Sequence, residues 1–294
     1  MESARTTRKP IDASGLFLAD KPSGLTSHDV VSIARHALGE PRIGHAGTLD
    51  PFASGLLVLL LGRATRLLPY LDGEPKEYVA TIRLGIETDT GDPEGRVTGT
   101  ADVPNAAALD AAMEMLTGSI LQRPPAFSAK KVAGRRSYQA ARRGETLAVQ
   151  PVEVIVHSWE VIATRDGELD VRIICGGGTY VRALAQQLGE LSRSAAHLSA
   201  LRRIRSGPFS VADACSVDQI KAADIRVLPS LDAVRSLPIE RLSSVHLLQI
   251  ARGVPIPAHA DGDRAALVDG NDVLIAIAQR KGDTWQPRVV LHDA

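Results

Sequence analysis

The chain has 294 residues, of which 44% are hydrophobic and 23% are charged, so it can form one or two globular domains with large cores. Its 34 basic and 34 acidic side chains cancel, so a nucleic-acid partner would have to bind a local cluster of positive charge. Two cysteines exclude a disulfide framework and a four-cysteine zinc site, and they favour a reducing, cytoplasmic setting.

The N-terminal residues predict neither a signal peptide nor a membrane anchor. MESARTTRKPID is polar and basic, without the apolar core of a signal peptide, and we expect a disordered lead-in over residues 1–12. The longest apolar run, Leu56–Leu61, is too short to span a bilayer. We therefore expect no membrane partner.

Further along the chain, hydrophobic periodicity predicts alternating strands and helices. Residues 77–85 and 168–178 alternate apolar and polar side chains, as half-buried strands do. Residues 105–118 have the composition of a helix that ends at a glycine. Residues 180–191 predict an amphipathic helix whose apolar face is Val181, Leu184, Ala185, Leu188 and Leu191. Because there is no regular βαβ rhythm, the pattern favours an α+β fold or a mixed sheet.

Three acidic residues in IETDTGDPEGRV (86–97) resemble a metal loop only superficially. Asp89, Asp92 and Glu94 lack the spacing of a calcium-binding loop, so we interpret the stretch as a hairpin connection. The histidines form no metal-ligand pair on one helical turn. We expect neither a metal nor an organic cofactor.

A basic segment over about 124–150 opens with Pro-Pro. It concentrates six cations within fourteen residues and has no acid among them: Lys130, Lys131, Arg135, Arg136, Arg142 and Arg143. These side chains form either a solvated helix face or a surface that binds phosphates. Like charges repel one another on a helix, which favours phosphate binding.

The C-terminal residues change in composition again. From about residue 236, short apolar runs are joined by Gly/Asp turns, which predicts a small all-β module over 236–294. The boundary falls near RSLPIE.

Two glycine-rich motifs contain the candidate chemistry. In GHAGTLDPFASG (44–55), Asp50 either caps a helix that starts at Pro51 or serves as a functional carboxylate. In GGGTYVRAL (176–184), Thr179 is well placed to cap a helix, which puts Arg182 at the third helical position. The helix dipole disfavours a cation there, so Arg182 should face a carboxylate or a phosphate, and Asp50 is a candidate.

Five motifs, in this order, resemble the TruB-type tRNA pseudouridine-55 synthases. They are LADKPSGLTSHDVV, RIGHAGTLDPFASGLLVLLLGRATR, KEYVATIRLG, CGGGTYVRALAQQLG and LRRIRSG. The resemblance covers nearly the whole chain. It implies a mixed, largely antiparallel central sheet with flanking helices over 13–235, and a small PUA-like β-barrel over 236–294.

The resemblance also implies an isomerase that detaches uracil from a tRNA nucleotide, turns the base and rejoins it to the ribose through C5. Asp50 would be the nucleophile, and the base would be flipped out of the T-loop to reach it. Tyr78 would stack on the uracil, Tyr180 and Leu201 would line the base pocket, and Arg182 would pair with Asp50. His45 would contact RNA, Lys21 matches a structural or substrate-side motif, and the basic segment corresponds to an RNA-clasping insertion.

The partners implied are the T-arm of tRNA and no obligate protein, with a monomeric enzyme. Two alternatives stay open: a guide-RNA-dependent synthase of the dyskerin type, and an RNA-binding or tRNA-folding module with secondary catalysis. The motifs do not decide whether Asp50 attacks the sugar or assists an elimination.

Overall fold

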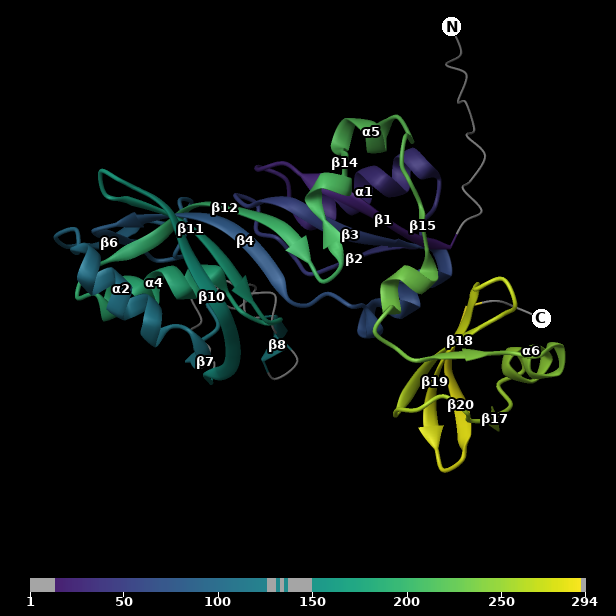
Figure 1. Cartoon of the computed structure of the whole chain (residues 1–294). Coiled ribbons are helices and arrows are strands. Elements are labelled where there is room, and N and C mark those ends of the chain that lie inside the picture. The colour runs from purple at the N-terminus through teal and green to yellow at the C-terminus, as the bar shows by residue number, and fades with distance from the viewer. Residues whose placement is uncertain (1–13, 126–130, 133–134, 137–149, 292–294) are drawn as a thin grey trace, which may run out of the picture.

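A computed structural model describes residues 14–125, 131–132, 135–136 and 150–291. Figure 1 shows a large sheet with flanking helices and a smaller, curled C-terminal sheet. Within these ranges, no helix has the length and apolarity to cross a bilayer. The lead-in expected over 1–12 lies outside the described residues.

The large sheet has a mixed topology, with eleven strands in the described part. Its main path runs β14-β1-β3-β12-β4-β11-β10-β7, and β2, β13 and β15 pair with strands along it. The pairs β1/β14 and β3/β12 are parallel. The remaining pairs are antiparallel, so the α+β class and the mixed, largely antiparallel sheet are confirmed. The strands are β1 (Gly15–Lys21), β2 (Ile43–Ala46), β3 (Ser54–Leu61), β4 (Lys76–Leu84), β7 (Gly118–Gln122), β10 (Val152–Arg165), β11 (Glu168–Cys175), β12 (Ala196–Ser206), β13 (Phe209–Ser210), β14 (Cys215–Ser216) and β15 (Leu228–Pro229).

Burial explains the sequence patterns of these strands. Strands β4 and β11 alternate as predicted, and their apolar side chains are buried. Strand β3 reads SGLLVLLL without alternation because both of its faces are covered. Its even-numbered apolar residues pack into one core and its odd-numbered leucines pack into another.

Two helix pairs cover parts of the sheet. Helix α1 (Ser27–Leu38), which begins with a Thr26–Asp29 capping box, contacts α5 (Val217–Lys221). Helix α2 (Ala106–Met115) contacts α4 (Val181–Leu191). Short 3₁₀ turns η1 (Gly62–Tyr70), η2 (Val211–Asp213) and η3 (Ser230–Val234) connect the strands.

Two details of the expected helices are wrong. The helix expected over 105–118 ends at Met115, because Leu116 closes its last turn and Gly118 begins the strand that pairs with β10. Leu191, expected on the buried face of the second helix, is 40% exposed at the end of α4. The hairpin expected over 86–97 is confirmed by β5 (Ile86–Thr88) and β6 (Val97–Thr100), which pair with each other.

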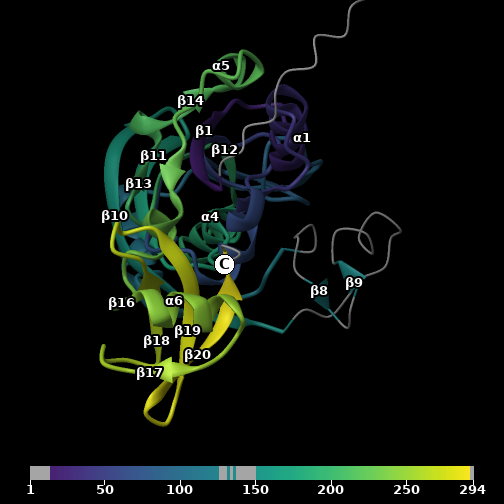
Figure 2. The same ribbon diagram turned by 90° about the vertical axis from the view of Figure 1, so that its right-hand side faces the viewer.

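The C-terminal sheet has the open order β16-β18-β19-β20-β17, so the expected barrel is a curled sheet in the described residues. It packs against the large sheet, because Ala266 and Leu274 share a core with Leu16 and Leu56. Figure 2 shows it in front of the large sheet, and Figure 1 shows α6 on the side that faces away from the large sheet. Its elements are β16 (Ile239–Arg241), α6 (Ser244–Ala251), β17 (Ile256–Pro257), β18 (Arg264–Val268), β19 (Leu274–Lys281) and β20 (Thr284–Val290).

Candidate active site

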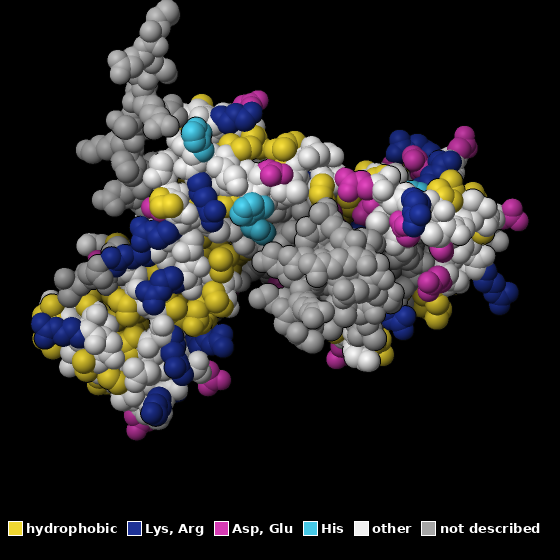
Figure 3. Space-filling view, turned by 180° about the vertical axis from the view of Figure 1, so that it is seen from behind, with side chains coloured by type: hydrophobic (Ala, Val, Ile, Leu, Met, Phe, Trp, Pro, Cys, Tyr) yellow, Lys and Arg dark blue, Asp and Glu magenta, His cyan; other side chains and the backbone are white. Residues whose placement is uncertain are grey.

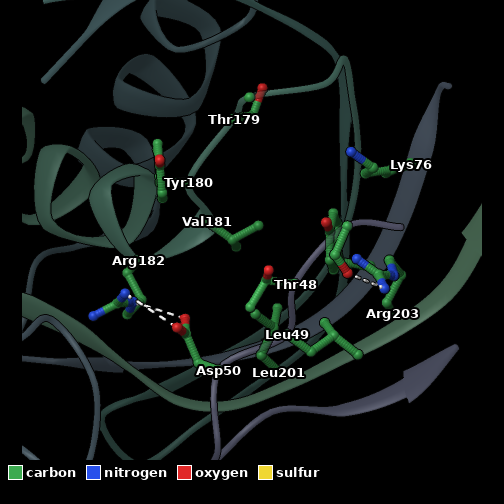
Figure 4. Close-up of a pocket in the computed structure, with 13 residues that line it drawn as sticks. Thr48, Leu49, Asp50, Lys76, Thr179, Tyr180, Val181, Arg182, Leu201 and Arg203 are labelled. Carbon is green, nitrogen blue, oxygen red and sulfur yellow. Dashed lines mark hydrogen bonds and ion pairs between the residues drawn. The ribbon is translucent and has the colours of Figure 1, made fainter. Parts of the chain in front are cut away.

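A cavity of about 250 Å³ opens between the loop after β2, the strands β4 and β12, and the N-terminus of α4. Figure 4 shows Asp50 and Arg182 at one end of it, and Lys76 and Arg203 at the other. Its lining residues are Gly47, Thr48, Leu49, Asp50, Lys76, Tyr78, Gly178, Thr179, Tyr180, Val181, Arg182, Leu201 and Arg203. Five of the residues to which the resemblance assigns a catalytic or substrate-binding role meet here: Asp50, Tyr78, Tyr180, Arg182 and Leu201.

Asp50 lies in the loop between β2 and β3. No helix starts at Pro51, so the helix-cap interpretation of Asp50 is wrong. Hydrogen bonds tie the neighbouring backbone to α1: the Ser27 hydroxyl donates to Leu49 O at 3.1 Å and accepts from Leu49 N at 2.9 Å. The loop is therefore anchored on both sides of the carboxylate, since Pro51 O accepts from Gly24 N at 2.8 Å.

Arg182 contacts the Asp50 carboxylate with two nitrogens. Its Nε lies 3.0 Å from Asp50 Oδ2, and its Nη2 donates to Oδ1 at 3.3 Å. A planar guanidinium that contacts both oxygens fixes the orientation of the carboxylate. The expected partnership of Asp50 and Arg182 is present in the structure.

A second carboxylate, Asp92, binds the guanidinium nitrogen of Arg182 that does not contact Asp50. Arg182 Nη1 donates to Asp92 Oδ2 at 3.1 Å and to Thr90 O at 3.0 Å. The side chains of Arg182 and Asp92 are only 5% and 7% exposed, whereas that of Asp50 is 35% exposed. Asp50 is therefore the member of the trio that faces the cavity.

The helix that positions Arg182 starts one residue later than expected. Its N-cap is Tyr180, which makes no side-chain cap, so Thr179 is not the cap and Arg182 is at the second helical position. Arg182 is still in the first turn, where the helix dipole disfavours a cation. The two carboxylates offset that cost.

Burial raises the pKa of Asp50 above its ordinary value. Arg182 opposes the rise, and the charge of Asp92 adds to it. Burial likewise raises the pKa of Tyr78, which the Arg203 guanidinium opposes. Tyr78 therefore keeps its hydroxyl proton at neutral pH.

The walls of the cavity are apolar and aromatic. Tyr78, on β4, and Leu201, on β12, are 6% and 8% exposed. Tyr180 is fixed through its backbone by Gln122, which accepts from Tyr180 N at 2.7 Å and donates to Tyr180 O at 3.1 Å. A flat base fits between such side chains.

Lys21 and His45 do not line the cavity. Lys21 Nζ donates to the carbonyls of Leu25 at 2.6 Å and Pro51 at 3.4 Å, so it holds the loop next to Asp50. Burial lowers the Lys21 pKa to about 8. Burial and the Arg203 charge lower the pKa of His45, on β2, and its buried Nδ1 has no hydrogen-bond partner in the described part of the chain.

Most of the basic segment lies outside the described residues, including Lys130, Arg142 and Arg143. The backbone of Lys131 and Val132 (β8) pairs with that of Arg135 and Arg136 (β9), so this part is not a helix face. The described residues contain no group of three or more His, Cys, Asp and Glu side chains that could hold a metal ion.

Sequence reasoning did not identify four residues of the site: Asp92, Gln122, Lys76 and Arg203. The sequence pattern places Asp92 only in the hairpin connection. Lys76 lies in the motif KEYVATIRLG and Arg203 in the motif LRRIRSG. The resemblance assigns no individual role to either residue.

Two family models match consecutive parts of the chain. Residues 35–181 match the N-terminal domain of the TruB family of pseudouridylate synthases. Residues 182–240 match a tRNA pseudouridylate synthase B C-terminal domain.

Curated relatives match over nearly their whole length. A tRNA pseudouridine synthase B from Thermobifida fusca is 42% identical over 289 residues, which cover 95% of this chain and 98% of that protein. The enzyme of that name from Mycobacterium tuberculosis strain H37Rv is 39% identical over 288 residues, which cover 95% and 96%.

Among solved structures, a chain in the crystal structure of a Cbf5-Nop10-Gar1 complex aligns with a TM-score of 0.73 at 26% identity. The alignment covers 95% of this chain and 85% of that chain. A chain in the structure of an H/ACA RNP bound to a substrate RNA containing 2'-deoxyuridine aligns with a TM-score of 0.70 at 25% identity.

Proposed function

The chain belongs to the TruB family of pseudouridylate synthases, and we propose that it isomerises uridine 55 in the T-loop of tRNA to pseudouridine. As a TruB-type protein it is a tRNA pseudouridine synthase. The choice of uridine 55 and of the T-loop rests on the resemblance of its motifs to that family.

The observation that carries the proposal is the half-exposed Asp50 carboxylate, held by Arg182 in a cavity with aromatic walls. Detaching uracil leaves an electron-poor C1′ on the ribose, and an oriented carboxylate can trap or stabilise that carbon. Asp50 is thus the proposed nucleophile, and Arg182 fixes its orientation. A uridine inside a folded loop reaches such a cavity only when it is flipped out.

The other residues receive roles that fit their positions. Tyr78 stacks on the flipped uracil, and Tyr180 and Leu201 line its pocket. Lys21 holds the Asp50 loop through the Pro51 carbonyl. His45 contacts the RNA just outside the cavity.

The proposed domains are a catalytic part over 13–235 and a PUA-like RNA-binding part over 236–294. Figure 3 shows more Lys and Arg than acidic side chains on one face of the C-terminal part, which supports an RNA contact there. The segment 124–150 is the proposed RNA clasp. We further propose a monomer, without an obligate protein partner, in the cytoplasm.

A guide-RNA-dependent synthase of the dyskerin type is the second candidate, and its support is the structural likeness to Cbf5. The relatives named tRNA pseudouridine synthase B match at higher identity over more of their length, which favours the tRNA enzyme. An RNA-folding role would accompany catalysis, because the described site keeps its carboxylate, its arginine and both tyrosines.

Tritium release tests the proposal. A T-arm hairpin with uridine tritiated at C5 is incubated with the protein in excess EDTA, because we expect no metal requirement. We expect release from the hairpin with uridine at position 55, and none when cytidine replaces that uridine. Release only after a guide RNA is added would favour the dyskerin type, and a complete lack of release in both cases would refute the synthase.

A further inference from the structure

Arg203 is buried in the wall of the cavity, opposite Asp50 (Figure 4). It lies on β12, between two strands of the site: it is the register partner of Gly55 on β3 and of Tyr78 on β4. Cross-strand partners point to the same face of a sheet, so the Arg203 guanidinium lies beside the Tyr78 phenol.

The Asp50 loop is built around this guanidinium. Arg203 Nε donates to Leu56 O at 2.8 Å, and Nη2 donates to Gly47 O at 2.8 Å. Gly47 has φ +68°, and a Cβ there would lie 3.0 Å from Arg203 Nη1, so both the backbone conformation and the close approach favour a glycine. One buried side chain therefore joins both ends of the loop to β12, which pairs with β4, the strand of Tyr78.

In the part of the chain that the structure describes, no carboxylate forms an ion pair with Arg203. Arg182 contacts Asp50 and Asp92, whereas none of the ion pairs among the described residues involves Arg203. A buried cation without a counterion is costly, so a negative charge that forms in this cavity would be stabilised by it. Burial is the main cause of the lowered pKa of Lys21, His45 and Lys76, and the charge of Arg203 adds to it; Asp50 opposes the shift at Lys21 and Glu74 opposes it at Lys76.

The proposed reaction produces such an anion. Whether Asp50 attacks C1′ or assists an elimination, the electron pair of the C1′–N1 bond stays on uracil. The ring stays negative until C5 bonds to C1′. This step breaks the bond between C1′ and the Asp50 oxygen in the first route, and it returns a proton to C2′ in the second. C5 then releases a proton to solvent and N1 takes one up. A cation fixed in the cavity wall stabilises this charge without reorganising.

We propose that Arg203 is a positioning residue that holds the Asp50 loop and Tyr78 on facing walls, and that its charge stabilises uracil as it leaves the ribose. This inference rests on the proposed synthase activity. It adds Arg203, on β12, to the residues that are proposed to support catalysis.

Arg203→Met and Arg202→Met form a matched pair of variants. Arg202 is next in the strand but makes a bidentate pair with Asp20, at 2.9 and 2.7 Å, outside the cavity. Under single turnover with saturating hairpin, Arg203→Met should be slower by about a hundredfold, as expected for loss of one pre-organised donor. The RNA affinity of Arg203→Met should stay within about twofold of wild type. The single-turnover rate of Arg202→Met should also stay within about twofold of wild type.

Changing the leaving group distinguishes the effect of the Arg203 charge from the effect of Arg203 on the position of the loop. A hairpin with 5-fluorouridine at the target carries a base that is more stable as an anion. Breakage of its C1′–N1 bond is followed by chromatography of the nucleosides after digestion. With this hairpin, the ratio of the wild-type rate to the Arg203→Met rate should be smaller by a factor of about ten than with the uridine hairpin. Equal defects for both hairpins would overturn the role of the charge.

If Arg203→Met does not fold, Arg203→Lys decides, because it keeps the charge but loses the planar fork. We expect a loss of about tenfold or more with normal RNA affinity; a rate within about twofold of wild type overturns the inference. An inactive wild type would instead refute the proposed function, which keeps the two failures distinct.

Discussion

At the scale of single residues, the Arg182 guanidinium organises the site because it contacts two carboxylates at once. Asp92 is buried and holds the arginine, and Asp50 faces the cavity. The geometry requires a fork with several donors, which a point charge does not supply.

Arg182→Lys should therefore be severely impaired. A lysine cannot hold Asp50 and Asp92 in fixed positions, and a small displacement of the reacting carboxylate costs about a hundredfold in rate. Single-turnover tritium release measures the effect, with RNA affinity as the control. A rate within about twofold of wild type would show that the pairing does not matter for the reaction.

Asp92→Asn should shift the pH dependence of the reaction. The negative charge of Asp92 helps to raise the pKa of Asp50, so its removal lowers that pKa. Activity that requires the Asp50 carboxylate falls as pH drops through this pKa, so the acid limb of the single-turnover profile should move to lower pH. An unmoved or raised acid limb contradicts the coupling of the two carboxylates.

The sequence predicts some of these residues and not others. The helix dipole disfavours a cation such as Arg182 in the first turn, so the sequence predicts an anion near it. The structure places Asp50 beside Arg182. The sequence does not predict the roles of Gln122 and Arg203, because these side chains bind backbone atoms of segments that are distant in the chain, such as Tyr180 and Gly47. Local periodicity carries no information about such contacts.

At the scale of elements, strand β12 assembles the site, because it lies between β3, which follows the Asp50 loop, and β4. A Cβ at Gly55 would lie 2.2 Å from Arg203 O, so the strands meet this closely only with a glycine there. Alternation correctly predicted β4 and β11. It could not predict their order in the sheet, nor the early end of α2, which depends on the pairing of β7 with β10.

The basic segment is the element whose function depends most on charge. Replacing Lys130, Lys131, Arg135 and Arg136 by Gln should weaken hairpin binding and reduce the slope of log affinity against log salt by about 3, because each phosphate contact releases counterions. Fluorescence anisotropy at several salt concentrations measures the slope. An unchanged slope with normal affinity would assign these side chains to a solvated surface.

At the scale of the whole molecule, the C-terminal sheet is held together around a buried carboxylate, Glu240. Its Oε2 accepts from the backbone N–H groups of His259 and Ala260 and from the indole of Trp285, at 2.8 to 2.9 Å. Burial raises the pKa of Glu240, but these hydrogen bonds outweigh burial and lower the pKa from 4.5 to about 2.

A carboxyl group with a depressed pKa stabilises the fold above its unfolded pKa, and that stability is lost as pH falls toward the folded value. The free energy of unfolding should thus decline between about pH 4.5 and 2. Glu240→Gln should reduce this decline, and Asp283→Asn, at an exposed position, should not. Urea unfolding followed by tryptophan fluorescence checks this, and an equal decline in all three proteins argues against a stabilising Glu240 network.

The central claim is that the Asp50 carboxylate performs the isomerisation. Single-turnover tritium release from a C5-labelled T-arm hairpin, compared for wild type and Asp50→Asn, tests it most directly. We predict release by wild type only, with hairpin affinity within a few-fold, since binding comes mainly from phosphate contacts. Burial disfavours the Asp50 charge, so the variant should melt at the same or a higher temperature. Release by Asp50→Asn near the wild-type rate would contradict the account.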